Sequence, residues 1–381
     1  MRVPDPRHKD RIVTDERLRL ADIEAHLADA VDGGYLFDEY TTLASGGSTG
    51  QRGVFVYDRD GMATYCLTFF RRLMIDRDRD PALRQNPVTI GWVAAAHPSH
   101  ASAAVARTFH DPGFVNFRFP VTLPLTDIVA GLNETNPMVL FSYPSALGLL
   151  AREAVAGRLR ITPVQVWSFA EPLLPEIRSA AEAAFGCTVR NGWGSSEIGA
   201  FAMPCDRGGA HLYQDIGILE AVDETGRPVP PGVRSARILV TNLFNPVLPL
   251  IRYEISDEVT VLAEPCPCGE IAPCIADIQG RFDDWFSYPS GVIHPHLFRS
   301  ALGRHPAIVE YRVRQTEGGA DVDVCVTAPI DLQAVAVELM DQLRHGGLPD
   351  PSVTIHQVDS VPRLANTGKI KRFVPLAGVT R

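Results

Sequence analysis

The chain has 381 residues, of which 45% are hydrophobic and 21% are charged, and its formal net charge is −9. This length allows two or more domains with a sizeable core, and the composition is that of a globular protein. The acidic balance, without a compensating basic stripe, argues against a nucleic-acid partner, and no apolar run is long enough to span a membrane. Since there are seven cysteines and no apolar signal core at the N-terminus, we expect a cytoplasmic protein without disulfides.

The first half of the chain alternates between helical and strand patterns. A helical period covers residues 11–40, and strand-like runs at 40–44 and 54–57 flank a glycine-rich loop. The helices expected after this loop are at 62–76, 99–109, 122–134, 144–157 and 172–185, and the strands are at 88–93, 138–142, 164–169 and 188–191. Alternation at this spacing predicts a mixed or parallel sheet covered by helices.

The second half is richer in strands and ends in a smaller unit. Strands separated by Pro/Gly turns are expected at 217–222, 236–241 and 258–262. The final unit has expected helices at 295–303 and 331–345 and expected strands at 308–315, 321–327 and 353–358. Two helices against one antiparallel sheet are typical of a ferredoxin-like module.

The predicted fold class is therefore a large α/β N-terminal domain with mixed sheets and a β-rich subdomain, plus a small α+β C-terminal domain joined by a hinge. We place these domains at residues 1–282 and 283–381.

The glycine-rich loop is Ser45-Gly46-Gly47-Ser48-Thr49-Gly50-Gln51-Arg52-Gly53. Glycines let backbone N–H groups turn toward an anion, and the Ser48 and Thr49 hydroxyls add donors, so the segment suits phosphate binding. It is not a Walker A loop, because no Gly-Lys-Ser/Thr follows at the required spacing. Taken alone, the loop is equally typical of a flexible surface segment.

Four further motifs carry candidate chemistry. Trp193-Gly194-Ser195-Ser196-Glu197 follows an expected strand, and it offers an aromatic face for a base and a carboxylate for a divalent cation. Taken alone, this string also fits a turn before another strand. The others are Ile251–Asp257, Gly280–Asp284 and Pro362–Arg372, in which an Asp could accept hydrogen bonds from a ribose and a Lys could reach an anion. Taken singly, a lysine in that last stretch fits an exposed basic tail.

In their order and spacing these motifs resemble those of the adenylate-forming ligase superfamily (acyl-CoA synthetases, peptide-synthetase adenylation domains and luciferases), and in particular its phenylacetate–coenzyme A ligase-like branch. The resemblance covers residues 40 to 376. The matching segments are Ser45–Gly50 for the phosphate loop, Phe169–Leu173 for the "Gly-Ala-Glu-Pro" turn, Trp193–Glu197, Arg252–Asp257, Gly280–Asp284 for the hinge, and Gly368–Arg372.

The resemblance implies an AMP-forming acid–thiol ligase that uses ATP and Mg²⁺ to convert a carboxylic acid to an acyl-adenylate and passes the acyl group to coenzyme A. The residues it places around the nucleotide are Ser45, Gly46, Gly47, Ser48, Thr49 and Gly50 at the phosphates, Glu171, Trp193 on adenine, Gly194, Ser195, Ser196, Asp257 on the ribose, and Arg281. It implies that Lys369, Glu197 with Mg²⁺, and Thr49 are catalytic. Asp283 would be the hinge about which the C-terminal domain rotates.

Two departures from the family pattern leave alternatives open. Gln51-Arg52 stands where the phosphate loop usually has a lysine, and the loop begins much earlier in the chain than in typical relatives. The acyl group could instead pass to an amine or a carrier-protein thiol, and a non-catalytic adenylate-binding homologue is a third alternative. Retention of Glu197, Asp257 and Lys369 argues against that third alternative. The identity of the acid stays open, as does the oligomeric state, for which a homodimer is one option.

A second cluster suggests a metal. Cys205 and His211 form a Cys-x5-His pair, and Cys266 and Cys268 form a stiff Cys-Pro-Cys turn. Three thiolates and an imidazole suit tetrahedral Zn²⁺ in a structural site, with Cys274 as an alternative for one ligand. Some members of the resembled branch show this pattern with bound zinc. However, Cys-x-Cys is less standard than Cys-x2-Cys, and such cysteines are often without a metal.

The resemblance places the acid beside the expected adenine site, near 141–144, 167–170 and 198–199. This largely aromatic lining favours an aryl or arylalkyl carboxylate. His97 and His100 are further candidates for the lining, although histidines here are equally compatible with packing or surface roles.

Overall fold

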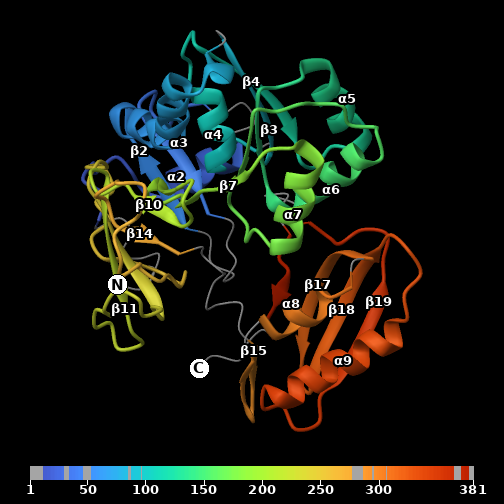
Figure 1. The fold of residues 1–381 in the computed structure, drawn as a ribbon. Coiled ribbons are helices and arrows are strands. Elements are labelled where there is room, and N and C mark those ends of the chain that lie inside the picture. The colour runs from blue at the N-terminus through green and yellow to red at the C-terminus, as the bar shows by residue number, and fades with distance from the viewer. Residues whose placement is uncertain are drawn as a thin grey trace. The chain divides into compact units, whose positions relative to one another are not determined.

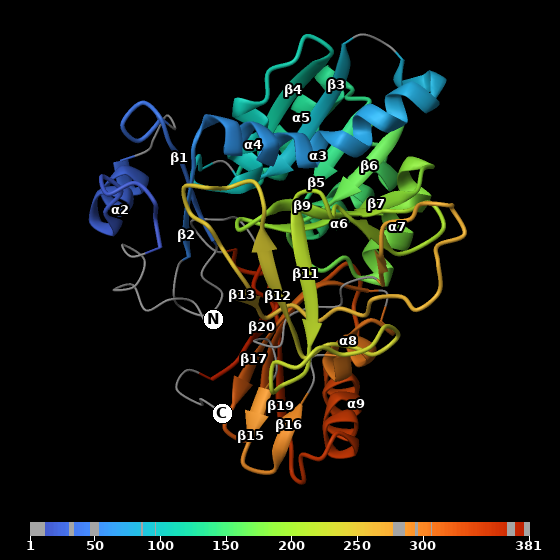
Figure 2. The same cartoon turned by 90° about the vertical axis from the view of Figure 1, so that its left-hand side faces the viewer.

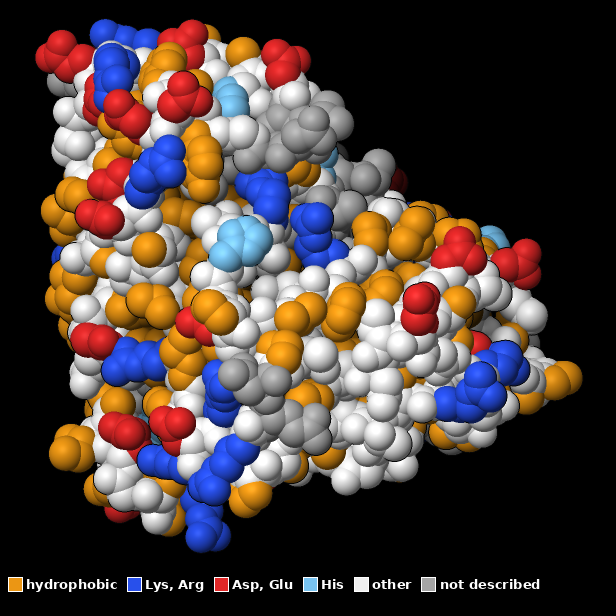
Figure 3. Space-filling model, turned by 90° about the horizontal axis from the view of Figure 1, so that it is seen from above, with side chains coloured by type: hydrophobic (Ala, Val, Ile, Leu, Met, Phe, Trp, Pro, Cys, Tyr) orange, Lys and Arg blue, Asp and Glu red, His pale blue; other side chains and the backbone are white. Residues whose placement is uncertain are grey.

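The computed structural model describes residues 12–29, 34–45, 53–84, 87–95, 97–276, 286–293, 296–305, 307–363 and 370–376. The chain forms two compact units, Met1–Gln279 and Gly280–Arg381 (Figure 1). The expected domain boundary at 282/283 lies outside the described residues. None of the described helices combines the length and the apolar character needed to cross a membrane. Acidic and basic side chains are interspersed over the face that Figure 3 shows.

A five-stranded parallel sheet forms the centre of the first unit. Its order is β4 (Phe114–Pro120), β3 (Val88–Ala94), β5 (Val139–Ser142), β6 (Gln165–Ser168) and β7 (Val189–Asn191). The helices around it are α3 (Arg59–Arg79), α4 (Ala101–Thr108), α5 (Leu125–Thr135), α6 (Pro144–Val155) and α7 (Pro175–Phe185), with a 3₁₀ turn η1 at Pro81–Leu83. Helices α3 and α4 cover one face of the sheet, and α5, α6 and α7 cover the other (Figure 1). The expected alternation of strands and helices is therefore confirmed.

Strand β4 was not expected from the sequence. It is an edge strand that pairs only with β3 in this sheet, and several of its side chains are partly exposed. Its mixture of aromatic, polar and charged residues therefore lacks the continuous apolar run that marks a buried parallel strand.

An aromatic ladder crosses the sheet on the face covered by α3. Trp92, Phe141 and Trp167 lie opposite one another in register on β3, β5 and β6. The rings of Trp92 and Phe141 are stacked with centroids 4.4 Å apart, and those of Phe141 and Trp167 are stacked at 5.5 Å. Phe70 of α3 packs against the edge of Trp92. Large stacked side chains in adjacent strands bury much apolar area and fix the spacing of α3 from the sheet.

The β-rich part of the first unit consists of one hairpin and two small sheets. The hairpin pairs β1 (Thr41–Ala44) with β2 (Val54–Tyr57), and helix α2 (Leu20–Asp29) buries Ile23 and Leu27 in the same apolar cluster (Figure 2). One sheet has the order β14 (Cys274–Ile275), β10 (Ala210–Leu212), β9 (Gly199–Pro204) and β8 (Trp193–Ser195), and the other has β11 (Gly217–Val222), β12 (Arg237–Asn242) and β13 (Tyr253–Ile255).

The strand expected at 258–262 is wrong. Only isolated bridges form there, from Thr260 to Arg234 and from Val261 to Ile275. Val259 of this alternating apolar segment is buried, but the segment does not pair along its length with a neighbouring strand.

The second unit contains a mixed sheet rather than the expected antiparallel one. Its order is β19 (Ser352–Gln357), β18 (Gly319–Val326), β17 (Ile308–Thr316) and β20 (Phe373–Val374), with helices α8 (His296–Leu302) and α9 (Leu332–His345) and a hairpin of β15 (Phe286–Tyr288) and β16 (Gly291–Ile293). Strands β17 and β18 are antiparallel, but β19 is parallel to β18 and β20 is parallel to β17. Because α9 returns the chain directly beside β18, the crossover is not split as in a ferredoxin-like module.

A buried carboxylate ties α3 to the central sheet. Asp76 is 5% exposed, and its Oδ1 accepts a hydrogen bond from Arg72 Nε at 2.8 Å. Its Oδ2 accepts hydrogen bonds from Arg190 of β7 at 2.6 Å and from Gln165 of β6 at 3.1 Å. Gln165 in turn accepts a hydrogen bond from Trp167 Nε1. This network gives the indole N–H of Trp167 a buried acceptor and joins α3 to β6 and β7.

We predict that Asp76→Ala lowers the free energy of unfolding by about 3 kcal/mol, the lower end of the range for one broken buried ion pair. The loss is limited because Asp206 still contacts both arginines. Urea unfolding measures the change. The matched control is Asp215→Ala, which removes an exposed partner of Arg71 and should cost at most about 1 kcal/mol. Equal losses in the two variants would contradict the prediction.

Candidate functional site

The Trp193–Glu197 turn lies at the carboxyl edge of the parallel sheet. Strand β7 ends at Asn191, and Gly192 N–H donates to the carbonyl of Ser168, the last residue of β6, at 3.0 Å. In open parallel sheets this edge is where ligands bind. The position expected from the sequence is therefore confirmed for this turn.

Trp193 and Asp257 come together although 64 positions separate them in the chain. Trp193 Nε1 donates to Asp257 Oδ2 at 3.1 Å, and the Asp257 side chain is buried. The indole ring is also tilted against Phe201, with centroids 6.0 Å apart. These two contacts hold the plane of the indole, so two of the expected nucleotide contacts share one site.

Side-chain donors hold three consecutive carbonyls of this turn. Tyr65 OH donates to Ser195 O at 2.9 Å, and Tyr57 OH donates to Ser196 O at 2.7 Å. Asn242 Nδ2 donates to the carbonyl of Glu197 at 2.8 Å. Burial raises the pKa of both tyrosines, and the charge of Glu197 adds to the effect, so both hydroxyls stay protonated donors. The backbone of the turn is therefore fixed from beneath.

Asn242 also connects this turn to the hairpin that carries the glycine-rich loop. Asn242 Oδ1 accepts the backbone N–H of Asn245, and Asn245 Nδ2 donates to Val56 O of β2 at 2.9 Å. At the base of the loop, Ser45 N–H donates to Gly53 O and Gly53 N–H donates to Ser45 Oγ, each at 2.8 Å. Both asparagines were missed in the sequence, where Thr-Asn-Leu-Phe-Asn-Pro shows only a turn.

Glu171 has a structural contact within the described part of the chain. Its carboxylate accepts hydrogen bonds from Ser145 N–H at 2.9 Å and from Ser145 Oγ at 3.2 Å. A carboxylate at the first turn of α6 satisfies a backbone donor that the helix itself leaves unpaired. The preceding residue, Ala170, has a left-handed φ of 68°, a strained conformation for a residue with a Cβ.

Eight other expected site residues lie outside the described ranges. These are Gly46, Gly47, Ser48, Thr49, Gly50, Arg281, Asp283 and Lys369. Of the residues expected near the acid, Phe141 and Trp167 are packed in the aromatic ladder, and His97 Nδ1 lies 2.8 Å from Ser99 Oγ.

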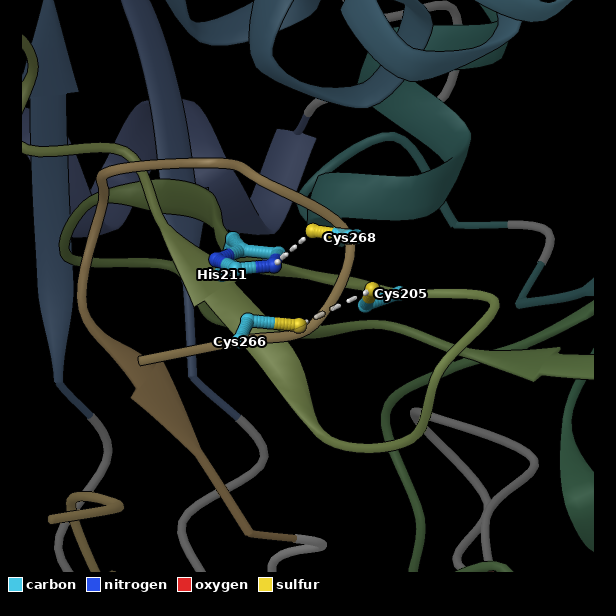
Figure 4. A group of neighbouring side chains, drawn as sticks. All are labelled: Cys205, His211, Cys266 and Cys268. Atoms are coloured by element: carbon cyan, nitrogen blue, oxygen red, sulfur yellow. Dashed lines mark hydrogen bonds between the residues drawn. The ribbon is translucent and has the colours of Figure 1, made fainter. Parts of the chain in front are cut away.

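The four expected metal ligands converge, as Figure 4 shows. Cys205 follows β9, His211 lies on β10, and Cys266 and Cys268 come from the loop before β14. Their ligand atoms all lie within 4.8 Å of one another. The sulfur of Cys205 is 3.6 Å from that of Cys266, and His211 Nε2 is 3.2 Å from Cys268 Sγ. Cys274 is not part of this group; its thiol contacts the carbonyls of Gly208 and Ile275 and the side chain of Cys266.

The surroundings of this cluster orient its ligand atoms. His211 Nδ1 lies 2.9 Å from Ala272 O, and because a carbonyl only accepts, Nδ1 is the donor; in the neutral imidazole the Nε2 lone pair then faces Cys268. Backbone N–H groups of Arg207 and Glu270 point at the sulfurs of Cys205 and Cys268, each at 3.4 Å. The backbone N–H of Cys268 lowers the pKa of Cys266, whereas burial raises that of Cys205 to about 12.

The chain is similar in sequence to two curated proteins, although no protein-family model matches it. It is 26% identical over 280 residues to phenylacetate–coenzyme A ligase of Thermus thermophilus, which covers 70% of this chain and 60% of that protein. It is 28% identical over 130 residues to Protein CapK of Staphylococcus aureus, which covers 34% of this chain and 27% of that protein. The chain thus spans less than two thirds of the length of either relative.

Solved structures of CoA ligases share the fold. A 2-hydroxyisobutyryl-CoA ligase in complex with R3-HIB-AMP superposes with a TM-score of 0.67 at 19% identity, over 94% of this chain and 79% of that one. An anthranilate CoA ligase in complex with anthranoyl-AMP gives 0.60 at 16% identity, over 87% and 65%. A benzoate CoA ligase from Burkholderia xenovorans gives 0.57 at 21% identity, over 87% and 67%. The solved structures show the fold, and the sequence similarity to a phenylacetate–coenzyme A ligase confirms the resemblance expected from the motifs.

We predict that Gly194→Ala disrupts the turn that carries Trp193. An added Cβ would lie 2.1 Å from Gly199 O and 2.7 Å from Ala200 Cα, so β8 and β9 would have to separate. Overpacking against backbone costs about 1–3 kcal/mol or more, visible as a lower thermal-unfolding midpoint and altered near-ultraviolet circular dichroism. The control is Gly148→Ala in α6, where the nearest atom is 3.6 Å away and alanine favours the helix. If both variants kept the wild-type midpoint, the required close approach would be disproved.

Proposed function

We propose that the chain uses ATP to activate a carboxylic acid as an acyl-adenylate and then transfers the acyl group to the thiol of coenzyme A. The observation that carries this proposal is the Trp193–Asp257 hydrogen bond at the carboxyl edge of the sheet, in a fold shared with CoA ligases. A fixed aromatic face beside a carboxylate matches what an adenine and its ribose require. The sequence similarity to a phenylacetate–coenzyme A ligase supports the same chemistry.

In this proposal each part of the site has one role. Trp193 stacks on adenine, Asp257 accepts hydrogen bonds from ribose hydroxyls, and the Ser45–Gly50 loop binds the phosphates. Two buried hydroxyls at this edge, Ser168 Oγ and Ser195 Oγ, have no hydrogen-bond partner among the described residues, as expected where a polar ligand binds.

Charge stabilisation would come from Glu197, Arg281 and Lys369. Glu197 offers a hard oxygen ligand for Mg²⁺, which supplies charge neutralisation at phosphate oxygens when bound, and Asn242 fixes its backbone. Lys369 pairs with the carboxylate and the α-phosphate as the acid oxygen attacks phosphorus and pyrophosphate leaves. Rotation about Asp283 then admits the thiol, which attacks the acyl carbon and releases AMP.

The proposed substrate is an aryl or arylalkyl acid. Phe169, half-buried at the end of β6, packs edge-on against Trp92 and Tyr143 and gives this edge of the sheet an aromatic wall. The related ligases whose structures hold anthranoyl-AMP or are named for benzoate act on aromatic acids.

We predict carboxylate-dependent exchange of labelled pyrophosphate into ATP, and we expect Lys369→Ala to lower it by at least about a hundredfold while ATP still binds. Lys371→Ala, which removes the same charge two positions later, is the matched control and should keep most of the activity. Scoring the acid panel with and without coenzyme A then identifies the acceptor. No exchange with any acid would refute adenylation, and exchange without thioester formation would point to an amine or a carrier-protein thiol.

We also propose that Cys205, His211, Cys266 and Cys268 hold a structural Zn²⁺. Zinc–sulfur bonds of about 2.3 Å at a tetrahedral angle put two sulfurs about 3.8 Å apart, close to the separation of Cys205 and Cys266. The tautomer of His211 and the backbone N–H groups at the sulfurs match the surroundings of a closed site.

We predict about one zinc per chain by metal analysis, and its loss in the Cys266→Ser/Cys268→Ser variant. Without the metal, the 205–275 region should loosen, which limited proteolysis and a lower unfolding midpoint would report. Cys187→Ser is the control, because this half-buried cysteine lies outside the cluster. Zinc retained in the double variant, or absent from the purified wild type, would contradict the assignment.

A further inference from the structure

A cavity of about 360 Å³ lies in the first unit, beside the carboxyl ends of β3 and β4. It is lined by residues of β3, β4 and α4, among them Trp92, Ala94, Ala103, Ala106, Arg107 and Arg118. This volume falls in the range of small-ligand sites. None of these residues belongs to the nucleotide site described above.

Small side chains on α4 and a fixed tryptophan build this space. Ala103 and Ala106 are buried on the helix face toward the sheet, where larger residues would fill the gap. Trp92 and Arg118 lie directly opposite each other in register on β3 and β4. Trp92 Nε1 donates to Asn116 at 2.8 Å and its ring stacks on Phe141, so the floor of the cavity is rigid.

The charge at this cavity is uncompensated. Neither Arg107 nor Arg118 forms an ion pair or a hydrogen bond with any residue in the described ranges. Arg107 is half-buried, whereas Arg118 of β4 is exposed. Arg72 and Arg190, which are also half-buried, both contact Asp76. Burial is the main cause that lowers the pKa of Arg107; Tyr35 acts in the opposite direction, and the charge of Arg118 also lowers this pKa. Two guanidinium groups that repel each other at a partly enclosed site are a ready binding place for an anion.

We propose that this cavity binds a carboxylate or phosphate group of a small organic ligand, with Arg107 and Arg118 as its counter-charges and Trp92 as its floor. The cavity lies at the edge where Ala94 and Pro120 end their strands, which is the carboxyl edge of the sheet that also carries Trp193. The identity of the anion rests on the proposed function: it is either a second carboxylate on the acid being activated or a phosphate of the coenzyme A acceptor.

The direct test needs no catalysis. Terephthalate, adipate and inorganic phosphate are titrated into the full chain by calorimetry, with the Arg107→Gln/Arg118→Gln variant in parallel. Glutamine keeps much of the side-chain volume, so the fold should survive, which the unfolding midpoint verifies. We expect at least one anion to bind at least about tenfold more weakly to the variant. Arg158→Gln, at an exposed pair with Glu153, is the matched control and should bind as the wild type does.

Kinetics then separate the two sources of the anion. If a second carboxylate occupies the cavity, the double variant raises KM for terephthalate and adipate in pyrophosphate exchange at least about tenfold and leaves benzoate and hexanoate unchanged. If a phosphate of coenzyme A occupies it, exchange is unchanged, and KM rises for coenzyme A but not for dephospho-coenzyme A.

The outcomes also separate this inference from the proposed function. If the anion binds in a way that depends on the two arginines, but no acid supports pyrophosphate exchange, the anion site is supported and the proposed ligase activity is refuted. If exchange is normal, and the double variant changes neither the binding of any anion nor any KM, the cavity assignment is overturned and the proposed ligase activity stands.

Discussion

Three hydrogen bonds to consecutive carbonyls hold the segment on which the candidate site depends. Tyr65, Tyr57 and Asn242 donate to the backbone of Ser195, Ser196 and Glu197. These donors come from α3, β2 and the end of β12, so the turn is bound to three elements that are distant from it in the chain. Because each buried donor and acceptor is satisfied by the other, moving the turn would leave several polar groups unpaired. The side chains of Trp193 and Glu197 therefore project from a fixed backbone.

The parallel sheet beneath this turn is held by a combination of apolar and polar contacts. The ladder of Trp92, Phe141 and Trp167 buries large rings across adjacent strands, while Asp76 gathers the polar groups that approach the ladder from α3 and β7. Large rings alone tolerate sliding, whereas a carboxylate with three directional partners does not. Together these contacts fix the positions of the strand ends relative to one another, and these ends form the edge at which ligands bind.

Among the described residues of the first unit, some charged side chains have a partner of opposite charge and others, which line a candidate site, do not. Asp76 and Asp206 neutralise the half-buried Arg72 and Arg190. The thiols of Cys205, Cys266 and Cys268 lie together beside His211, and Arg107 and Arg118 form no ion pair among the described residues. A half-buried charge without a partner, such as that of Arg107, is unfavourable, so a bound anion would contribute to stability at this place.

The sequence by itself determined the alternation of strands and helices in residues 88–191, the motif order of an adenylate-forming ligase, and the four metal-ligand candidates, because periodicity and short-range spacing are local properties. It did not reveal the edge strand β4, the unsplit crossover to β19, or the failure of 258–262 to form a strand, because sheet pairing depends on neighbours distant in the chain. Only the tertiary structure brought Trp193 to Asp257, placed Asn242 beneath Glu197, and left Arg107 and Arg118 beside one cavity. Those relations arise from packing between segments, and packing has no signature in a single stretch of sequence.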